Sequence, residues 1–214
     1  MSKAFWAVVA IIVVVFGGII LFHNNKAAAP TNSNGAAATN HTEGKGSSGV
    51  TLVEYGDYEC PFCGEFYPTV KQVVAKYNDQ IIFQFRNLPL LQIHPNALAG
   101  AKAAEAAGLQ GKFWEMHDLL YANQSDWAQS SNPQSFFNQY ATQLSLNLTQ
   151  FKQDYASDKV NNSINADIAA FQKTGQSEST PSFFLDGKYV QPSNNSVQAL
   201  SSLIDAEIAK KTKQ

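Results

Sequence analysis

Hydrophobic residues are arranged in three different ways along this chain of 214 residues. Residues 4–22 form an apolar run without a single charged side chain. Residues 23–49 are small or polar and include no bulky apolar side chain. From residue 50 onwards, apolar positions recur with the periods expected of strands and helices. The pattern therefore divides the chain into an apolar N-terminal segment, a polar linker and one folded domain over residues 50–214.

The folded domain begins with a predicted strand, helix and second strand. Residues 50–55 (VTLVEY) and 81–90 (IIFQFRNLPL) are rich in β-branched and aromatic residues, which favour strands. Between them, the apolar residues from Phe66 to Tyr77 recur with helical spacing. The start of the domain is therefore predicted to be a β-α-β unit.

The rest of the domain is predicted to be a helical block followed by a hairpin and a final helix. The hairpin is expected at residues 182–190, where Asp186 and Gly187 form the turn. A closing amphipathic helix is expected at residues 196–213, with lysines in its last turn that suit the helix dipole. The helical block is expected to include segments at about residues 96–108, 112–124, 133–144, 149–157 and 160–173.

The apolar run at residues 4–22 is long enough to cross a bilayer, which takes about 20 residues. It is longer than the roughly 7–15 apolar residues of a secretory signal. Lys3 precedes it, and this charge favours an orientation with the domain outside the cytoplasm. Ala27 and Ala29 offer a small-residue cleavage site, so a cleaved signal is the alternative to a transmembrane anchor. Both interpretations place the domain in the cell envelope.

The linker and the overall charge limit the possible partners. Residues 23–49 bury too little apolar surface to offset the entropy of ordering them, so this segment is predicted to be a flexible tether. The net charge of −2 lacks the basic excess of nucleic-acid-binding proteins, and we expect no nucleic-acid partner. The length suits one domain with an insertion, which we expect to be a monomer.

Cys60 and Cys63, in the stretch CPFC, are the only cysteines in the chain. A zinc site needs about four ligands, and the four histidines have no matching spacing, so no metal site is expected. A structural disulfide that closes so short a loop would remove little entropy from the unfolded state. A C-x-x-C pair between a strand and a helix is typical of a redox pair. The helix N-terminus then lowers the pKa of the first cysteine.

From about residue 50 to residue 211, the chain resembles the membrane-tethered DsbA-like thiol-disulfide oxidoreductases of the thioredoxin superfamily. The resemblance rests on residues 50–70, 86–124 and 179–190. It implies an α/β thioredoxin fold with an inserted all-helical domain at about residues 95–173. In this family the fold follows an N-terminal transmembrane helix and a flexible linker. The resemblance implies no metal and no bound organic cofactor.

The resemblance also assigns roles to residues of this sequence. Cys60 matches the nucleophilic, exposed cysteine and Cys63 the buried resolving cysteine, while Pro61 and Phe62 match the dipeptide that tunes the pair. Phe62 stands where the most oxidising members have histidine, and phenylalanine cannot offer a hydrogen bond or a positive charge to the thiolate. Asp57, Glu59 and Glu65 add nearby negative charge that opposes thiolate formation.

Two further positions are expected to complete the site. Thr180 and Pro181 match the residues joined by the family's cis peptide bond, on a loop that faces the cysteines and pairs with substrate backbone. Glu54 matches the buried acidic residue beneath the second sulfur. A carboxyl in such a place has a raised pKa and can transfer the thiol's proton.

The expected function is donation of the Cys60–Cys63 disulfide to reduced or unfolded exported proteins. The resemblance implies re-oxidation by a membrane quinone-linked partner of the DsbB or vitamin K epoxide reductase type. Two alternatives remain open at this point. One is a disulfide reductase or isomerase outside the cytoplasm, and the other is a tethered peptide-binding module, or holdase, whose cysteines are incidental.

Overall fold

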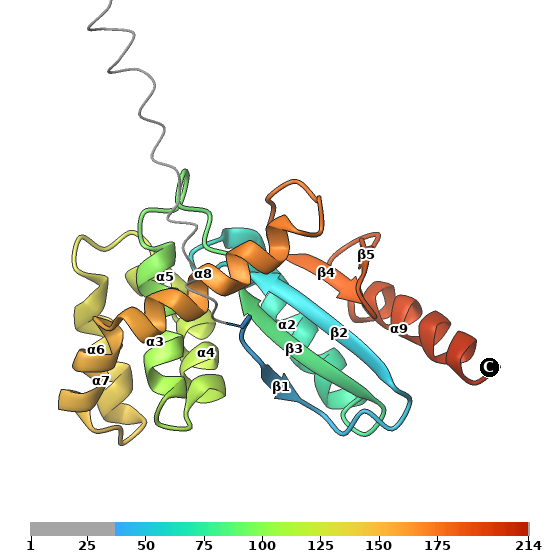
Figure 1. Ribbon diagram of the computed structural model, residues 1–214, viewed down its shortest axis with the longest axis horizontal. Helices are drawn as coiled ribbons and strands as arrows, with labels where there is room; N and C mark the ends of the chain where they lie inside the picture. The colour runs from blue at the N-terminus through green and yellow to red at the C-terminus, as the bar shows by residue number, and fades with distance from the viewer. Residues whose placement is uncertain (1–36, 214) are drawn as a thin grey trace, which may run out of the picture. The chain divides into compact units, whose positions relative to one another are not determined.

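The computed structural model describes residues 37–213 (Figure 1). The predicted anchor or signal at residues 4–22, and the part of the linker before residue 37, lie outside the described residues. Among residues 37–213, no helix has both the length and the apolar character needed to span a bilayer.

A five-stranded mixed sheet forms the centre of the domain, in the order β1-β3-β2-β4-β5. Strand β2 lies in the middle, parallel to β3 and antiparallel to β4. Glu54 on β2 is paired with Phe85 of β3 and Phe183 of β4, so strands flank it on both sides. The strands are β1 (His41–Glu43), β2 (Val50–Gly56), β3 (Ile81–Asn87), β4 (Ser182–Leu185) and β5 (Lys188–Val190).

The helices follow the predicted segments closely. Helix α2 (Pro61–Lys76) connects β2 to β3, and α9 (Val197–Lys211) closes the described chain. The insertion between β3 and β4 consists of α3 (Ala97–Gly108), α4 (Phe113–Ala122), α5 (Gln124–Trp127), α6 (Pro133–Gln143), α7 (Leu148–Tyr155) and α8 (Asp158–Gln172). The predicted α/β order with a helical insertion at about residues 95–173 is therefore confirmed, and among the helices of residues 37–213 only the four-residue α5 was not predicted.

The insertion lies beside the sheet, and α8 leads the chain back from it to β4 (Figure 1). The sheet and the insertion share one cluster of buried hydrophobic side chains. Gly100 of α3 lies at one contact between them, since a Cβ there would be 2.9 Å from Trp127 and 3.0 Å from Tyr58. The turn that precedes the cysteines is thus packed directly against the insertion.

The flexible linker predicted for residues 23–49 is wrong for its last part, because β1 lies within it and pairs with β3. Polar contacts hold this segment. The Thr39 backbone N–H and hydroxyl each donate to the buried Asp167 carboxylate at 2.7 Å. The His41 ring stacks on Phe113 with 3.5 Å between ring centroids. Such contacts leave no hydrophobic pattern in the sequence. This explains why the hydrophobic pattern predicts a start at Val50, whereas the folded region begins earlier.

Candidate active site

Cys60 and Cys63 lie at the start of helix α2, directly after the loop that follows β2. Cys60 is the N-cap residue, with φ −65° and ψ 121°, and Cys63 lies in the first turn of the helix. Both are free thiols, with exposed fractions of 3% and 1%. The expectation of an exposed Cys60 is therefore wrong. The backbone carbonyl of Thr180 covers its sulfur and accepts a hydrogen bond from the thiol at 3.5 Å.

The surroundings of Cys60 favour its thiolate. Its pKa is lowered to about 6, and the largest cause is a hydrogen bond from the Cys63 thiol. Burial opposes this shift, while the side chain of Thr180 and the backbone N–H groups of Cys63 and Phe62 add to it. These N–H groups belong to the first turn of α2, where they have no partner within the helix and the helix dipole is positive. The predicted thiolate at the helix N-terminus is thus supported by the contacts.

The pKa values of Cys63 and Glu54 are shifted in the opposite direction, because both are raised. Burial raises the pKa of Cys63 well above its usual range, and the nearby charges of Cys60 and Glu54 add to this effect. Burial alone raises the pKa of Glu54 to about 8. Glu54 is 3% exposed because it lies on the central strand β2. It is therefore a buried carboxyl close enough to Cys63 to influence its charge, as expected, and not an exposed charge at a strand end.

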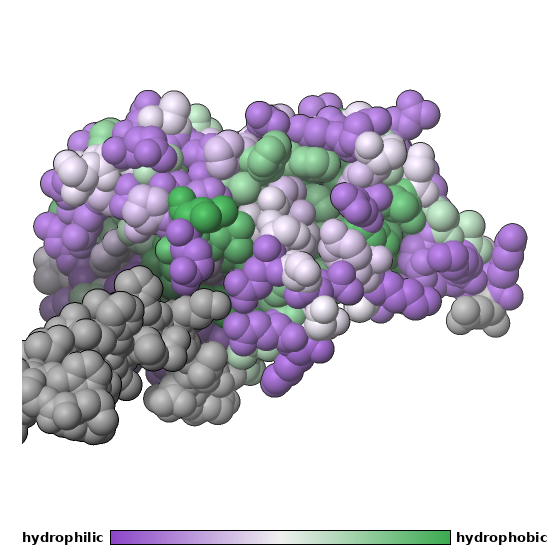
Figure 2. All heavy atoms as spheres, turned by 90° about the horizontal axis from the view of Figure 1, so that it is seen from above, coloured by the Kyte–Doolittle hydropathy of each residue, from purple (hydrophilic) through white to green (hydrophobic). Residues whose placement is uncertain are grey.

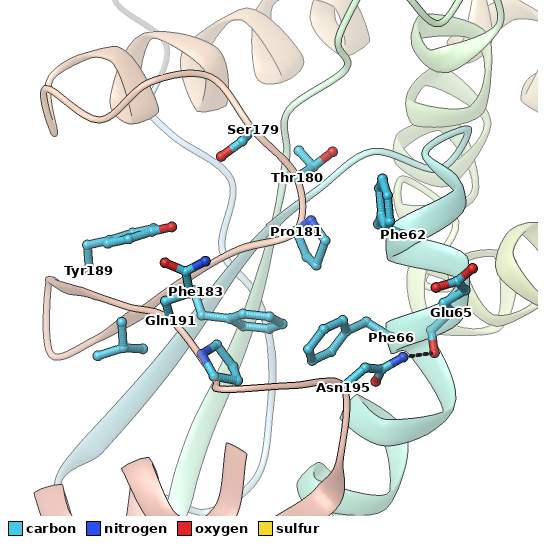
Figure 3. Close-up of a pocket in the computed structure, with 12 residues that line it drawn as sticks. Phe62, Glu65, Phe66, Ser179, Thr180, Pro181, Phe183, Tyr189, Gln191 and Asn195 are labelled. Atoms are coloured by element: carbon cyan, nitrogen blue, oxygen red, sulfur yellow. Dashed lines mark hydrogen bonds between the residues drawn. The ribbon is translucent and has the colours of Figure 1, made fainter. Parts of the chain in front are cut away.

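The loop before β4 forms one wall of the site. The Thr180–Pro181 peptide bond is cis, as predicted. Figure 3 shows Thr180 and Pro181 opposite Phe62, with Phe66 and Phe183 deeper in the same hollow. This groove has a volume of about 300 Å³. The residues that line it are Phe62, Glu65, Phe66, Ser179, Thr180, Pro181, Phe183, Tyr189, Val190, Gln191, Pro192 and Asn195.

Several large hydrophobic side chains of the domain are exposed. Phe62 is 67% exposed, and Ile93, on the loop between β3 and α3, is 68% exposed. Leu91 on the same loop and Tyr189 on β5 are also exposed. Figure 2 views the domain from above, and hydrophobic side chains are visible there among polar ones. A peptide bound in the groove would therefore meet the exposed rings of Phe62 and Tyr189.

Of the three acidic residues expected to oppose the thiolate, Asp57 and Glu59 are buried and make other contacts, whereas Glu65 is exposed. Asp57 accepts hydrogen bonds from the backbone N–H groups of Glu59 and Leu90, and its carboxylate lies 2.6 Å from Nδ1 of His94. Glu59 accepts from the backbone N–H of Asn96 at 2.5 Å. These carboxylates fasten the turn before Cys60 to the loop after β3.

Sequence reasoning missed the polar residues contributed by distant elements. Gln124 on α5 donates to the backbone carbonyls of Tyr58 and Cys60. Asn195 donates to the backbone carbonyl of Glu65 at the rim of the groove, at 2.8 Å (Figure 3). No local pattern marks either residue, because each is separated from its partner by 64 or more positions. The only sequence signal is the small residue Gly64 next to Cys63, which lies beside Gln124.

Comparison with known proteins agrees with this geometry. A protein-family profile described as Thioredoxin matches residues 36–206. A thioredoxin-like oxidoreductase from Silicibacter pomeroyi DSS-3 is 24% identical, with a TM-score of 0.66 over 84% of this chain and 97% of its own. The thiol-disulfide exchange protein α-DsbA2 from Wolbachia pipientis is 19% identical, also with a TM-score of 0.66, over 78% of this chain and 86% of its own. The fold is therefore the thioredoxin fold with a helical insertion.

One curated relative is named as an ion antiporter and not as an oxidoreductase. The Na(+)/H(+) antiporter NhaA 1 of Salinispora arenicola is 38% identical over 170 residues, which is 79% of this chain and 25% of that protein. The chain thus spans about a quarter of that relative's length. The alignment and the Thioredoxin profile overlap over most of this chain, so the shared part is a thioredoxin-like domain. The antiporter name therefore describes the whole relative and carries no argument for ion transport by this domain.

Proposed function

The chain belongs to the thioredoxin family, and from this premise we propose that it is a DsbA-like thiol-disulfide oxidoreductase that donates its Cys60–Cys63 disulfide to exported proteins. The observation that supports this direction is the opposite shift of the two thiols. The pKa of Cys60 is lowered to about 6, whereas that of Cys63 is raised well above its usual range. A stabilised thiolate is a good leaving group, so the reduced enzyme is favoured and the disulfide is an oxidant.

In the proposed mechanism, a substrate thiolate attacks Sγ of Cys60 and breaks the Cys60–Cys63 bond. The electron pair goes to Cys63, and Glu54, which is mostly protonated at neutral pH, supplies the proton that this sulfur takes up. A second substrate thiolate then attacks the substrate sulfur of the mixed disulfide and Cys60 leaves as a thiolate. The substrate loses two electrons and the enzyme is released in its reduced form.

We assign the loop with Pro181 and the groove beside Phe62 to substrate binding. The Thr180 carbonyl already faces Cys60, which is where the backbone of an extended peptide would pair. The exposed rings of Phe62 and Tyr189 suit apolar side chains of an unfolded substrate. Pro61 and Phe62 tune the pair mainly through backbone geometry, since neither side chain has a donor for the thiolate.

The proposal places the domain outside the cytoplasm, held by the apolar run at residues 4–22. Its re-oxidation would require a membrane quinone-linked partner of the DsbB or vitamin K epoxide reductase type. The supports for this part are the uncharged N-terminal run and the family resemblance. We propose that the enzyme acts as a monomer.

The reduction potential of the Cys60–Cys63 pair tests the direction of the reaction. We expect a value between about −270 mV, typical of thioredoxin, and about −120 mV, the value of a strongly oxidising DsbA. Equilibration with glutathione buffers, read by thiol alkylation, gives this potential. A value at or below that of thioredoxin would favour the reductase alternative.

A trapping experiment tests the role in oxidative folding. In a Cys63→Ala variant, the Cys60 thiolate can still attack a disulfide of a substrate, which releases the other substrate sulfur as a thiolate. The mixed disulfide should then accumulate, because the Cys63 thiol that would displace Cys60 is lost. Mass spectrometry of the captured chains then identifies the substrates, with a Cys60→Ala, Cys63→Ala double variant as the control. If the captured set contains no exported protein, the proposed role is wrong.

A further inference from the structure

Gln124 connects the helical insertion to the turn that carries Cys60. Its side-chain Nε2 donates to the backbone carbonyl of Tyr58 at 2.8 Å and to that of Cys60 at 2.9 Å. The carbonyl of Cys60 also accepts the helical hydrogen bond from the N–H of Gly64 at 3.1 Å. One amide group from α5 thus bridges the two carbonyls on either side of Glu59, directly before α2.

Gly64 leaves the space that this amide occupies. A Cβ at position 64 would lie 2.5 Å from Oε1 of Gln124, 3.0 Å from its Cδ and 3.2 Å from its Nε2. These are the three nearest atoms to such a Cβ, and a Cβ does not approach another heavy atom to 2.5 Å without a shift. Gly64 lies inside α2, where alanine would be the better helix former. Position 64 is therefore a glycine at the place where the Gln124 side chain approaches the helix backbone closely.

The position of the Cys60 backbone matters for its sulfur. The thiolate is stabilised by the N–H groups of Phe62 and Cys63, and these act only if Cys60 keeps its N-cap conformation. Asp57 fixes one side of the preceding turn, because it accepts from the N–H of Glu59. Gln124 fixes the carbonyl side of the same turn.

We propose that Gln124 is a positioning residue for the redox pair, and that Gly64 is required because it admits the Gln124 side chain. Through these contacts, the insertion holds Cys60 in the geometry in which the helix N–H groups stabilise its thiolate. The inference deepens the proposed function and rests on it, since it concerns the reactivity of the same cysteine. The insertion is then part of what sets the redox properties of the pair as well as a cover for the sheet.

The test compares Gln124→Ala, Gly64→Ala and the double variant in the full chain. In Gln124→Ala, we expect the Cys60 pKa to rise by about 0.5–1 unit and the equilibrium constant for oxidation of glutathione to fall roughly three- to tenfold. Gly64→Ala should shift the pKa in the same direction, because its methyl group displaces the amide. In the double variant, the methyl group finds space, so adding Gly64→Ala to Gln124→Ala should cause no further shift.

Thiolate absorbance at 240 nm against pH and glutathione equilibration provide the two readouts. Ser125→Ala is the matched control, because Ser125 is an exposed neighbour on α5 whose hydroxyl contacts only Asp126, at 3.5 Å. In the Ser125→Ala variant, the Cys60 pKa and the equilibrium constant with glutathione should equal those of the wild type.

Two results would overturn the inference. The first is a Gln124→Ala protein whose free energy of unfolding falls while its Cys60 pKa is unchanged, which would make Gln124 a purely structural contact. The second is that Gly64→Ala raises the Cys60 pKa by the same amount in the wild-type background and in the Gln124→Ala background. A wild-type potential like that of thioredoxin would defeat the oxidase proposal alone, because the differences between variants would still report on positioning.

Discussion

At the residue scale, two thiols in one helical turn have pKa values shifted in opposite directions. Cys60 lies where N–H groups and the thiol of Cys63 stabilise its charge, whereas Cys63 has the burial without enough compensating donors. A Cys60 pKa of about 6 lies between the values of about 7 in thioredoxin and about 3.5 in a strongly oxidising DsbA. Phenylalanine at position 62 is consistent with this intermediate value, since it leaves the stabilisation to backbone groups.

Glu54→Gln should change the pH dependence of stability and slow the reduction of the Cys60–Cys63 disulfide. The folded pKa of about 8 lies above the ordinary value of 4.5, so the contribution of Glu54 to stability is full below pH 4.5 and is lost as the pH rises through 8. Glutamine stays neutral, so the variant should gain stability over the wild type across this window, by up to about 5 kcal/mol. Urea unfolding of the reduced proteins at pH 5, 7 and 9 measures this difference.

The same variant should also be reduced more slowly by a substrate thiol, because Cys63 loses the carboxyl that supplies its proton when the Cys60–Cys63 bond breaks. Stopped-flow measurement of reduction by a thiol peptide gives the rate. Asp79→Asn, which neutralises an exposed carboxylate in the turn after the other end of α2, is the control and should show neither effect. A stability difference that does not change between pH 5 and 9 would contradict a raised Glu54 pKa.

At the element scale, β1 shows how a strand with little apolar character is held in place. Asp167 on α8 accepts from both the N–H and the hydroxyl of Thr39, and from both the backbone N–H and the side-chain amide of Asn87. It thereby joins the segment before β1, the end of β3 and the insertion. Glu105 extends this network to Asn87 and His41, at 2.7 and 2.9 Å.

Asp167→Ala should therefore destabilise the protein by about 2–4 kcal/mol, because it leaves buried donors without partners. Hydrogen exchange should increase first in residues 37–43. Asp154→Ala removes an exposed carboxylate on α7 that bonds only Gln150, and should change the unfolding free energy by less than about 0.5 kcal/mol. Unchanged exchange at residues 37–43 in Asp167→Ala would show that sheet pairing alone orders this segment.

At the scale of the whole molecule, the sheet and the insertion form one core, and the site lies where they meet. The turn before Cys60 contacts the loop after β3 through Asp57 and the insertion through Gln124. The groove combines α2 with segments more than 110 residues further along the chain, from Ser179 to Asn195. Reactivity and substrate binding therefore depend on the complete domain.

The position at which the domain begins can be tested with two shortened chains. A chain that starts at residue 37 should keep the melting temperature and disulfide-exchange rate of the described domain, since it keeps β1 and Thr39. A chain that starts at Val50 should melt at a lower temperature, because it loses the β1–β3 pairing and the Thr39–Asp167 bonds. Equal melting temperatures for the two chains would support the boundary at residue 50 that the sequence predicts.

The cis bond before Pro181 was predicted only through the family resemblance, whereas the sequence by itself determined the order of the main elements and the redox pair. It could do so because periodicity reports burial locally, and because the C-x-x-C pair at a helix start carries its own chemistry. The buried position of Glu54 was predicted only through the family resemblance, and the central place of β2 in the sheet accounts for it.

Only the tertiary structure decided the burial of Cys60, the ordering of residues 37–49 and the contact between Gln124 and Gly64. Each depends on polar groups that meet across long separations, such as the 128 positions between Thr39 and Asp167. Cys60 and Thr180 are 120 positions apart, and Gln124 and Cys60 are 64 apart. Single polar contacts of this kind require the completed fold to bring the partners together, so they leave no periodic signal along the chain.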